Sequence, residues 1–301
     1  MKRSVFVQQN GSECDFNSSG SWVILSPIEQ SIKRKIEAVG TPLKDWDIQI
    51  NYGIKTGFND AFIINTEKRN EILENCQTED EYTRTAELIR PILRGRDIKR
   101  YGYDWAELWI INTHNGIKGK LPRVDVNEYP AIKAHLDQYW DKISKRADKG
   151  DTPYNLRNCA YMEDFFKPKI VWAELARTGN AFALDFDHNM VANTGYILTV
   201  PSKNQDELLY LLAFLNSRFM LYSLNQITTR FDENGWRWLR QFVEQLRVPP
   251  LINKNKILSI VATITKDNKQ EISEILNNVI ADIYDFTDEE KAYINQTLSN
   301  Y

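Results

Sequence analysis

The chain has 301 residues, of which 42% are hydrophobic, 12% aromatic and 26% charged. This composition excludes a disordered chain and predicts a sizeable core, in one large domain or two smaller ones. The longest uninterrupted apolar run, LLYLLAFL at 208–215, has eight residues. A membrane-spanning helix needs roughly 20, so we expect no membrane partner.

The net charge of −3, from 38 basic and 41 acidic residues, at first argues against binding to a polyanion. The charge is unevenly distributed, however. Residues 271–301 contain seven acidic residues and one lysine, which gives −6 and leaves +3 for residues 1–270. Binding to a polyanion depends on a local stripe of Lys and Arg rather than on the charge of the whole chain.

Cys14, Cys76 and Cys159 are odd in number and lie far apart, without a CxxC pair or clustered histidines. This pattern predicts reduced thiols and no zinc site. The amino terminus lacks the apolar segment of a secretory signal, so we expect a cytoplasmic protein.

The polar residues 1–21 are predicted to form a linker or tail. The capping box Ser26-Pro27-Ile28-Glu29 begins a helix that Gly40 ends. Strands at 48–52 and 61–64 are expected to pair as a hairpin around a polar turn. Further strands are predicted at 108–111, 169–175, 181–185 and 195–200, and helices at 67–75, 79–89, 130–146, 206–226, 254–266, 270–284 and 287–299.

These elements predict an α+β fold with a β-rich domain at 22–250, peripheral helices, and a helical carboxyl-terminal region at 251–301. His135 is expected to be a partly exposed residue of the helix at 130–146.

The usual signatures of catalysis are missing. No two of the 13 glycines are separated by one residue, which excludes GxG and with it the Rossmann and methyltransferase glycine loops. Walker, HExxH and GxSxG motifs are also absent. The (Asp/Glu)-x-Lys tripeptides at 97–99, 267–269 and 289–291 match a nuclease pattern, as chance predicts for a chain this charged. We therefore expect no catalytic and no metal-binding residues in this chain.

Three segments contain polar or basic residues that suit ligand binding rather than catalysis. Residues 52–62 hold Lys55, Thr56 and Asn59 beside two glycines, and an ordinary hairpin loop is the alternative interpretation. Residues 90–101 carry +4, which suits phosphate oxygens but also fits a solvated basic face. Residues 142–157 lead from a basic helix end into a Gly/Asp/Pro turn, and cations at a helix end are favourable without a ligand. Further cations lie among aromatic residues at 177 and 230–240.

The order of several sequence blocks resembles the TaqI-type carboxyl-terminal specificity domain of type IIG restriction-modification enzymes and related adenine-N6 DNA methyltransferases. The tail IADIYDFTDEEKAYI at 280–294 is similar to the closing segment of those proteins and of type I specificity subunits. The blocks are GIKTGFNDAFII at 53–64, ELIRPILRGRDIKRY at 87–101, YPAIKAHL at 129–136, KRADKGDTPYNLR at 145–157, FFKPKIVWAEL at 165–175 and LLYLLAFLNSRF at 208–219.

The resemblance implies a target recognition domain that grips double-stranded DNA, reads base edges in the major groove and presents an adenine to a methyltransferase domain or subunit. The parent enzymes use S-adenosylmethionine, and type IIG members also cleave DNA with magnesium. This chain departs from them because the (Asn/Asp)-Pro-Pro-(Tyr/Phe) tetrapeptide is missing and VPPL at 248–251 does not replace it. We therefore expect no cofactor in this chain, which is either a fragment of a larger enzyme or a separate specificity subunit.

Within this interpretation, clustered cations position the duplex and loop side chains read its bases. The expected phosphate contacts are Arg94, Arg96, Lys99, Arg100 and Arg146. The expected base-reading residues are Lys55, Thr56, Asn59, Arg157, Arg177, Arg230 and Arg237. Together they should converge in one trough that is wide enough for a double helix. Two alternatives stay open: a protein-interaction module that docks on a separate methyltransferase, and an enzyme that itself methylates or cleaves DNA.

Overall fold

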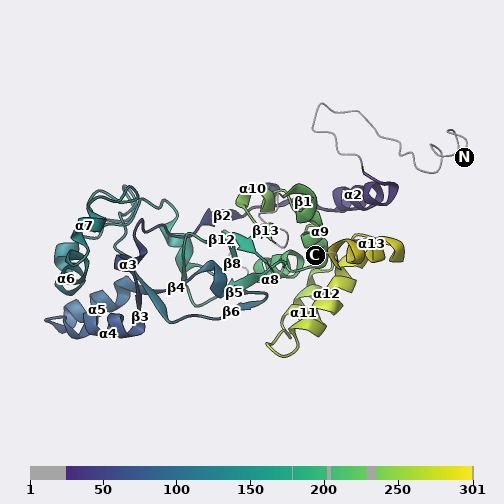
Figure 1. Ribbon diagram of the computed structural model, residues 1–301. Helices are drawn as coiled ribbons and strands as arrows, with labels where there is room; N and C mark the ends of the chain where they lie inside the picture. The colour runs from purple at the N-terminus through teal and green to yellow at the C-terminus, as the bar shows by residue number, and fades with distance from the viewer. Residues whose placement is uncertain (1–24, 178, 202–204, 229–234, 300–301) are drawn as a thin grey trace, which may run out of the picture.

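The computed structural model describes residues 25–177, 179–201, 205–228 and 235–299. The predicted linker at 1–21 and Arg230 lie outside these residues. Figure 1 shows β-structure in the middle of an elongated molecule, with helices α4 to α7 at one end and helices α2, α12 and α13 at the other. Both α-helices and several β-sheets are present, which confirms the predicted α+β fold.

The helices are α2 (Pro27–Val39), α3 (Asn59–Phe62), α4 (Thr66–Glu74), α5 (Glu79–Leu88), α6 (Pro130–Asp137), α7 (Trp140–Ile143), α8 (Gln205–Leu215), α9 (Arg218–Ile227), α10 (Arg240–Val243), α11 (Lys254–Val261), α12 (Lys269–Ile283) and α13 (Asp288–Ser299). The strands are β1 (Thr41–Pro42), β2 (Gln49–Tyr52), β3 (Ile63–Asn65), β4 (Ile89–Leu93), β5 (Ile98–Lys99), β6 (Gly102–Tyr103), β7 (Leu108–Ile111), β8 (Lys169–Ala173), β9 (Leu175–Ala176), β10 (Phe182–Asp185), β11 (Met190–Val191), β12 (Gly195–Thr199), β13 (Trp236–Arg237) and β14 (Arg247–Val248).

The central sheet has the strand order β10-β8-β12-β2, and its neighbouring strands are antiparallel. Strand β8 is buried on both faces, because Ile170 and Trp172 point into one hydrophobic core and Val171 points into another. Successive side chains of a strand point to opposite faces, so an uninterrupted apolar run is what a doubly covered strand requires. The central sheet therefore separates two cores.

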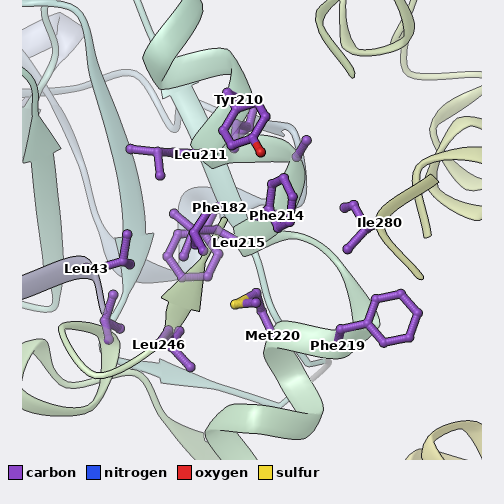
Figure 2. Packing of buried hydrophobic residues seen from close by; sticks show 14 of the residues in the cluster. Leu43, Phe182, Tyr210, Leu211, Phe214, Leu215, Phe219, Met220, Leu246 and Ile280 are labelled. Atoms are coloured by element: carbon purple, nitrogen blue, oxygen red, sulfur yellow. The ribbon is translucent and has the colours of Figure 1, made fainter. Parts of the chain in front are cut away.

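The first core lies between the sheet and the carboxyl-terminal helices. Figure 2 shows Phe182 of β10 among Leu211 and Leu215 of α8 and Met220 of α9. Helices α11, α12 and α13 pack against α8 and α9, and their buried residues belong to the same core. The acidic carboxyl-terminal segment thus folds back on the rest of the chain.

The second core lies on the opposite face of the sheet, beneath a second sheet with the order β11-β4-β7-β3 and helices α3 to α6. Strand β11 pairs in parallel with β4, whereas β4–β7 and β3–β7 are antiparallel pairs. Figure 1 shows α3 to α7 toward one end of the molecule, with β3 and β4 beside them.

The predicted hairpin between residues 48–52 and 61–64 is wrong. Strand β2 pairs with β12 of the central sheet, and β3 pairs with β7 of the second sheet. Ala61 and Phe62 belong to the short helix α3 rather than to a strand. Alternating apolar residues predict a strand but do not identify its partner, and here each strand completes a different sheet.

Two predicted helices are broken. The helix at 206–226 divides at Asn216 and Ser217, because the Asn216 amide pairs with the backbone N–H and carbonyl of Phe182 and Ser217 caps α9. The helix at 130–146 divides into α6 and α7 at Tyr139. His135 is buried, contrary to expectation, and its Nε2–H donates to the carbonyl of Ala61 at 3.0 Å. Along the described residues, no helix is both long and apolar enough to cross a membrane.

Candidate nucleic-acid interface

Three chain segments run side by side in parallel where the two sheets meet. Ile54 forms a parallel bridge with Ala192, and β11 beside it pairs in parallel with β4. The Ile54 N–H donates to the Val191 carbonyl at 2.6 Å, and the Ala192 N–H donates to the Leu93 carbonyl at 2.8 Å. The residues that follow each segment therefore leave at the same edge. They are Lys55 and Thr56, Arg94 and Gly95, and Asn193 and Thr194.

Glycines allow the loop at 53–59 to pack closely at this edge. A Cβ atom on Gly53 would lie 2.0 Å from the carbonyl oxygen of Ala192, a distance that no side chain tolerates. Gly57 has a positive φ of 72°, and a Cβ atom there would lie 2.7 Å from the carbonyl oxygen of Asp148. The loop at 53–59 is therefore held against the chain at 191–193 on one side and against the loop at 146–158 on the other.

Lys55 and Arg157, both predicted to read bases, meet at the carboxylate of Asp148. Lys55 Nζ lies 2.8 Å from Asp148 Oδ2, and Arg157 Nη1 lies 3.3 Å from Asp148 Oδ1. The hydrogen bond from Lys55 lowers the pKa of the Asp148 carboxyl below its ordinary 3.8, so the carboxylate is charged at neutral pH. Side chains from two loops thus form one exposed cluster of mixed charge.

Arg146 is not a phosphate contact, which corrects the sequence prediction. It is 7% exposed, and its guanidinium stands 4.4 Å from the centre of the Phe62 ring. Nη1 donates to the carbonyls of Thr56 and Asp148, and Nη2 donates to those of Pro153 and Asn155. Burial lowers the pKa of Arg146 to about 10, and it stays charged at neutral pH. Arg146 therefore ties the loops at 53–59 and 146–158 together from beneath.

The burial of Thr56 also corrects the prediction that its side chain reads a base. It is 2% exposed, and its hydroxyl donates to the side-chain oxygen of Asn59 at 2.6 Å. A buried hydroxyl that already has a partner does not reach a base edge. Asn59 itself is exposed at the start of α3, where Thr56 orients its amide.

The four cations of the basic segment at 94–100 differ in their exposure and in their hydrogen-bond partners within the protein. Arg94 donates to Asp97 through Nε and Nη2, at 3.0 and 2.7 Å, and this pair stabilises the turn at Gly95–Asp97. Arg100 is half-buried and donates through Nη2 to the Asn216 carbonyl, where α8 ends and α9 begins. Arg96 and Lys99 are exposed, and Lys99 Nζ donates to the Arg96 carbonyl at 2.6 Å. The phosphate contacts of Arg94, Arg96, Lys99 and Arg100 stay predictions.

Hydrogen bonds connect this edge to the remaining predicted residues. The Gly95 N–H donates to the Thr194 hydroxyl at 2.9 Å, and the Glu174 N–H donates to the Thr194 carbonyl at 3.0 Å. Strand β9 then pairs with β13, which contains Arg237. Arg177 is exposed directly after β9, and Arg237 is half-buried.

The structure adds residues that the sequence interpretation did not select. Asp148 and Asp151 are such residues, since Asp151 Oδ2 lies 3.6 Å from Nη1 of Arg123 and Asp151 Oδ1 accepts from Asn115 at 3.0 Å. Lys118, Lys120 and Arg123 belong to a turn with two glycines, the same pattern of Gly and cations that marked residues 53–59 and 94–100. That pattern could have identified this turn.

The arrangement offers cations, amides and carboxylates on neighbouring loops. In the part of the chain that the structure describes, no group of three or more His, Cys, Asp or Glu side chains is placed to hold a metal ion. Val248 and Pro249 of the VPPL segment are buried, and the Pro249 carbonyl accepts a hydrogen bond from the Tyr210 hydroxyl at 3.0 Å. Pro250 and Leu251 of the same segment are exposed.

Comparison with known proteins yields one family and several relatives. The sequence profile of the TaqI-like C-terminal specificity domain matches residues 90–248. The type II methyltransferase M.MjaIV of Methanocaldococcus jannaschii is 24% identical over an alignment of 226 residues, which covers 72% of this chain and 70% of that protein.

Two solved structures share the fold. The type IIL restriction-modification enzyme MmeI, solved in complex with DNA, has a TM-score of 0.61 at 13% identity, and the type IIG restriction endonuclease BpuSI has a TM-score of 0.52 at 15% identity. Each similarity covers 85% of this chain but only 36% of the MmeI chain and 32% of the BpuSI chain. This chain thus spans about a third of the length of these enzymes.

Proposed function

Because the chain belongs to the TaqI-like C-terminal specificity domain family, we propose that it recognises a specific sequence in double-stranded DNA as the specificity part of a restriction-modification adenine-N6 DNA methyltransferase. The observation that carries the proposal is the parallel arrangement of Ile54, β11 and β4, which delivers three polar loops to one edge. Loops that a rigid sheet positions are a common way to present side chains to a ligand.

We assign phosphate contacts and base contacts to the exposed side chains according to their position. Arg96 and Lys99 are exposed cations on the segment beside the loop edge and suit phosphate oxygens. Lys55, Asn59 and Arg157 are exposed on the loops at 53–59 and 146–158, and they have the donor and acceptor groups that read base edges in the major groove. Arg177, directly after β9, and Arg237, in β13, are further candidates for base contacts.

The methyl-transfer chemistry is assigned to a methyltransferase domain or subunit that works with this chain. S-adenosylmethionine, which supplies the methyl group, would bind to that part, as would magnesium if the parent enzyme also cleaves DNA. The residues present here do not fit the cofactor, since the sequence has no GxG turn and VPPL lacks the Asn or Asp before the prolines and the Tyr or Phe after them. Calorimetric titration of the chain with S-adenosylmethionine should give no binding heat, and a saturable signal would favour the enzyme alternative.

Selection from a pool of random-sequence DNA duplexes tests the recognition itself. The full chain should enrich one short motif at about 0.1 M salt, and the enriched duplex should bind on the order of a thousandfold tighter than a scrambled one. Absence of binding, or equal binding to both duplexes, would contradict the proposal.

Single substitutions test whether Arg157 reads a base and whether Arg96 contacts a phosphate. Arg157→Ala should cost about 1–3 kcal/mol with the enriched duplex and relax one position of the motif. Arg96→Ala should weaken binding to both duplexes alike and reduce the salt dependence by about one phosphate contact. Equal losses on cognate and scrambled DNA for both variants would overturn the assignment.

A further inference from the structure

A hollow of about 780 Å³ lies beside the loops described above. It is bounded by the turn at 115–123 and by residues 158–160, with Asp151 on its wall. The turn closes through a bridge between Ile117 and Leu121, and this places Lys118, Gly119 and Lys120 at its tip. The residues assigned above to DNA do not include any part of this turn.

The hollow is lined by cationic and by apolar side chains. Its cations, Lys118, Lys120 and Arg123, are exposed, and residues 114–123 contain no acidic residue. Ile117, Leu121 and Ala160 supply apolar surface between them. A ligand that fits this lining carries negative charges beside apolar groups, as the phosphates and deoxyribose rings of a DNA strand do.

The ion pairs of Lys120 and Arg123 lie at the surface. Lys120 pairs with Glu163, and Arg123 stands 3.6 Å from Asp151, with both members of each pair more than 40% exposed. Exposed pairs contribute little stability. A phosphate can therefore replace either carboxylate at small cost.

The hollow adjoins the base-reading loops. Asn115 accepts from the Asp151 N–H at 2.8 Å and donates to the side chains of Asp151 and Asn158, which fixes the turn against the loop at 146–158. The same loop carries Asp148, which pairs with Lys55 and Arg157. A strand that lies across Lys55 and Arg157 thus has the turn at 115–123 as its next neighbour.

We infer that the turn at 115–123 and the hollow beside it bind the sugar-phosphate backbone of the duplex next to the bases that Lys55 and Arg157 read. This inference rests on the proposed function and adds Lys118, Lys120 and Arg123 to it. The turn contributes affinity and register but no base discrimination.

The test compares two matched double variants of the full chain. Lys118→Ala/Lys120→Ala removes the two lysines at the tip of the turn. Lys254→Ala/Lys256→Ala removes two lysines at the same spacing on α11, where Lys254 likewise pairs with a surface carboxylate, that of Asp206. Binding to the selected duplex and to a scrambled duplex is measured between about 0.05 and 0.2 M salt, with thermal unfolding as the check on folding.

The first variant should bind both duplexes on the order of tenfold more weakly near 0.15 M salt. Its slope of log affinity against log salt should be shallower by about 1.8, because each phosphate contact contributes roughly 0.9. Its selected motif should match that of the unmodified chain, and the α11 variant should leave affinity and slope unchanged.

Three results would count against the inference, and they are distinguishable. If the unmodified chain binds no DNA, both the proposed function and this inference fail. If it binds but the Lys118→Ala/Lys120→Ala variant keeps the same salt slope, only the turn is excluded. If that variant loses one position of the motif, the turn reads a base and its assignment to the backbone is wrong.

Discussion

Asp148 and Asp151 lie on one loop, and each pairs with a cation from a different neighbouring loop. Asp148 pairs with Lys55, and Asp151 pairs with Arg123. The loop at 146–158 is therefore the centre of the candidate interface, with the loop at 53–59 on one side and the turn at 115–123 on the other. Of its two acidic residues, Asp148 holds Lys55 and Arg157 at one carboxylate in the protein without DNA.

Substitution of Asp148 tests this role. Asp148→Asn removes the carboxylate that Lys55 and Arg157 share, so both cations become free to meet phosphates without being held in position. Affinity for scrambled DNA should rise about fivefold, and the preference for the selected duplex should fall. Asp141→Asn, at an exposed position of α7, makes the same change in net charge and is the control. Equal effects of both variants would show that net charge alone is responsible.

Arg146→Lys tests whether the buried guanidinium of Arg146 holds the same loops together. Lysine has no planar fork and cannot reach the four carbonyls of Thr56, Asp148, Pro153 and Asn155 together. Buried carbonyls would lose their partners, and the free energy of unfolding should fall by about 3 kcal/mol in urea titrations. The exposed Arg157→Lys should change it by less than about 0.5 kcal/mol. A stable Arg146→Lys variant would show that the four bonds are dispensable.

Local patterns in the sequence predicted most elements but not their long-range partners. The apolar runs at 108–111 and 169–175 correspond to β7 and β8, because a strand that is buried on both faces needs such a run. The partner of β2 is β12, far along the chain, and no local pattern specifies that pairing. Asn216 breaks the predicted helix at 206–226 because its amide bonds to β10, again a distant element.

The candidate site shows the same limit. Lys55 and Arg157 were selected from the sequence as separate loop residues, and the structure joins them through Asp148. Arg146 resembles any other cation of a basic segment until the carbonyls around it are known. Side-chain type thus predicted which loops are polar, whereas burial and distant contacts decide which of their cations face the solvent.

His135 predicts a dependence of stability on pH. Burial lowers its pKa below the ordinary 6.5, against the opposing effect of its hydrogen bond to the Ala61 carbonyl. Because the folded state binds the proton less tightly than the unfolded state, the free energy of unfolding should decrease as the pH falls below 6.5. His135→Gln keeps a donor for Ala61 but does not titrate. Urea midpoints between pH 7 and 5 should fall less steeply in this variant, and parallel curves would exclude His135 as the source.

The pair of Lys169 and Asp185 holds β8 and β10 together inside the protein. Both side chains are fully buried, and Lys169 Nζ lies 2.6 Å from Asp185 Oδ2. Asp185 also accepts hydrogen bonds from the backbone N–H groups of Asp187 and Asn189. Lys169→Met would leave this buried carboxylate without its cation and should lower the free energy of unfolding by about 3–5 kcal/mol.

Two further variants separate the pair itself from general packing. Lys167→Met removes an exposed lysine that pairs with Asp164 at 2.6 Å, and it should cost less than about 1 kcal/mol. The double variant Lys169→Met/Asp185→Asn removes both charges and should recover more than half of the stability that Lys169→Met loses, because an uncharged amide tolerates burial better than an unpaired carboxylate. A double variant as unstable as Lys169→Met would show that lost packing, rather than the unpaired charge, accounts for the effect.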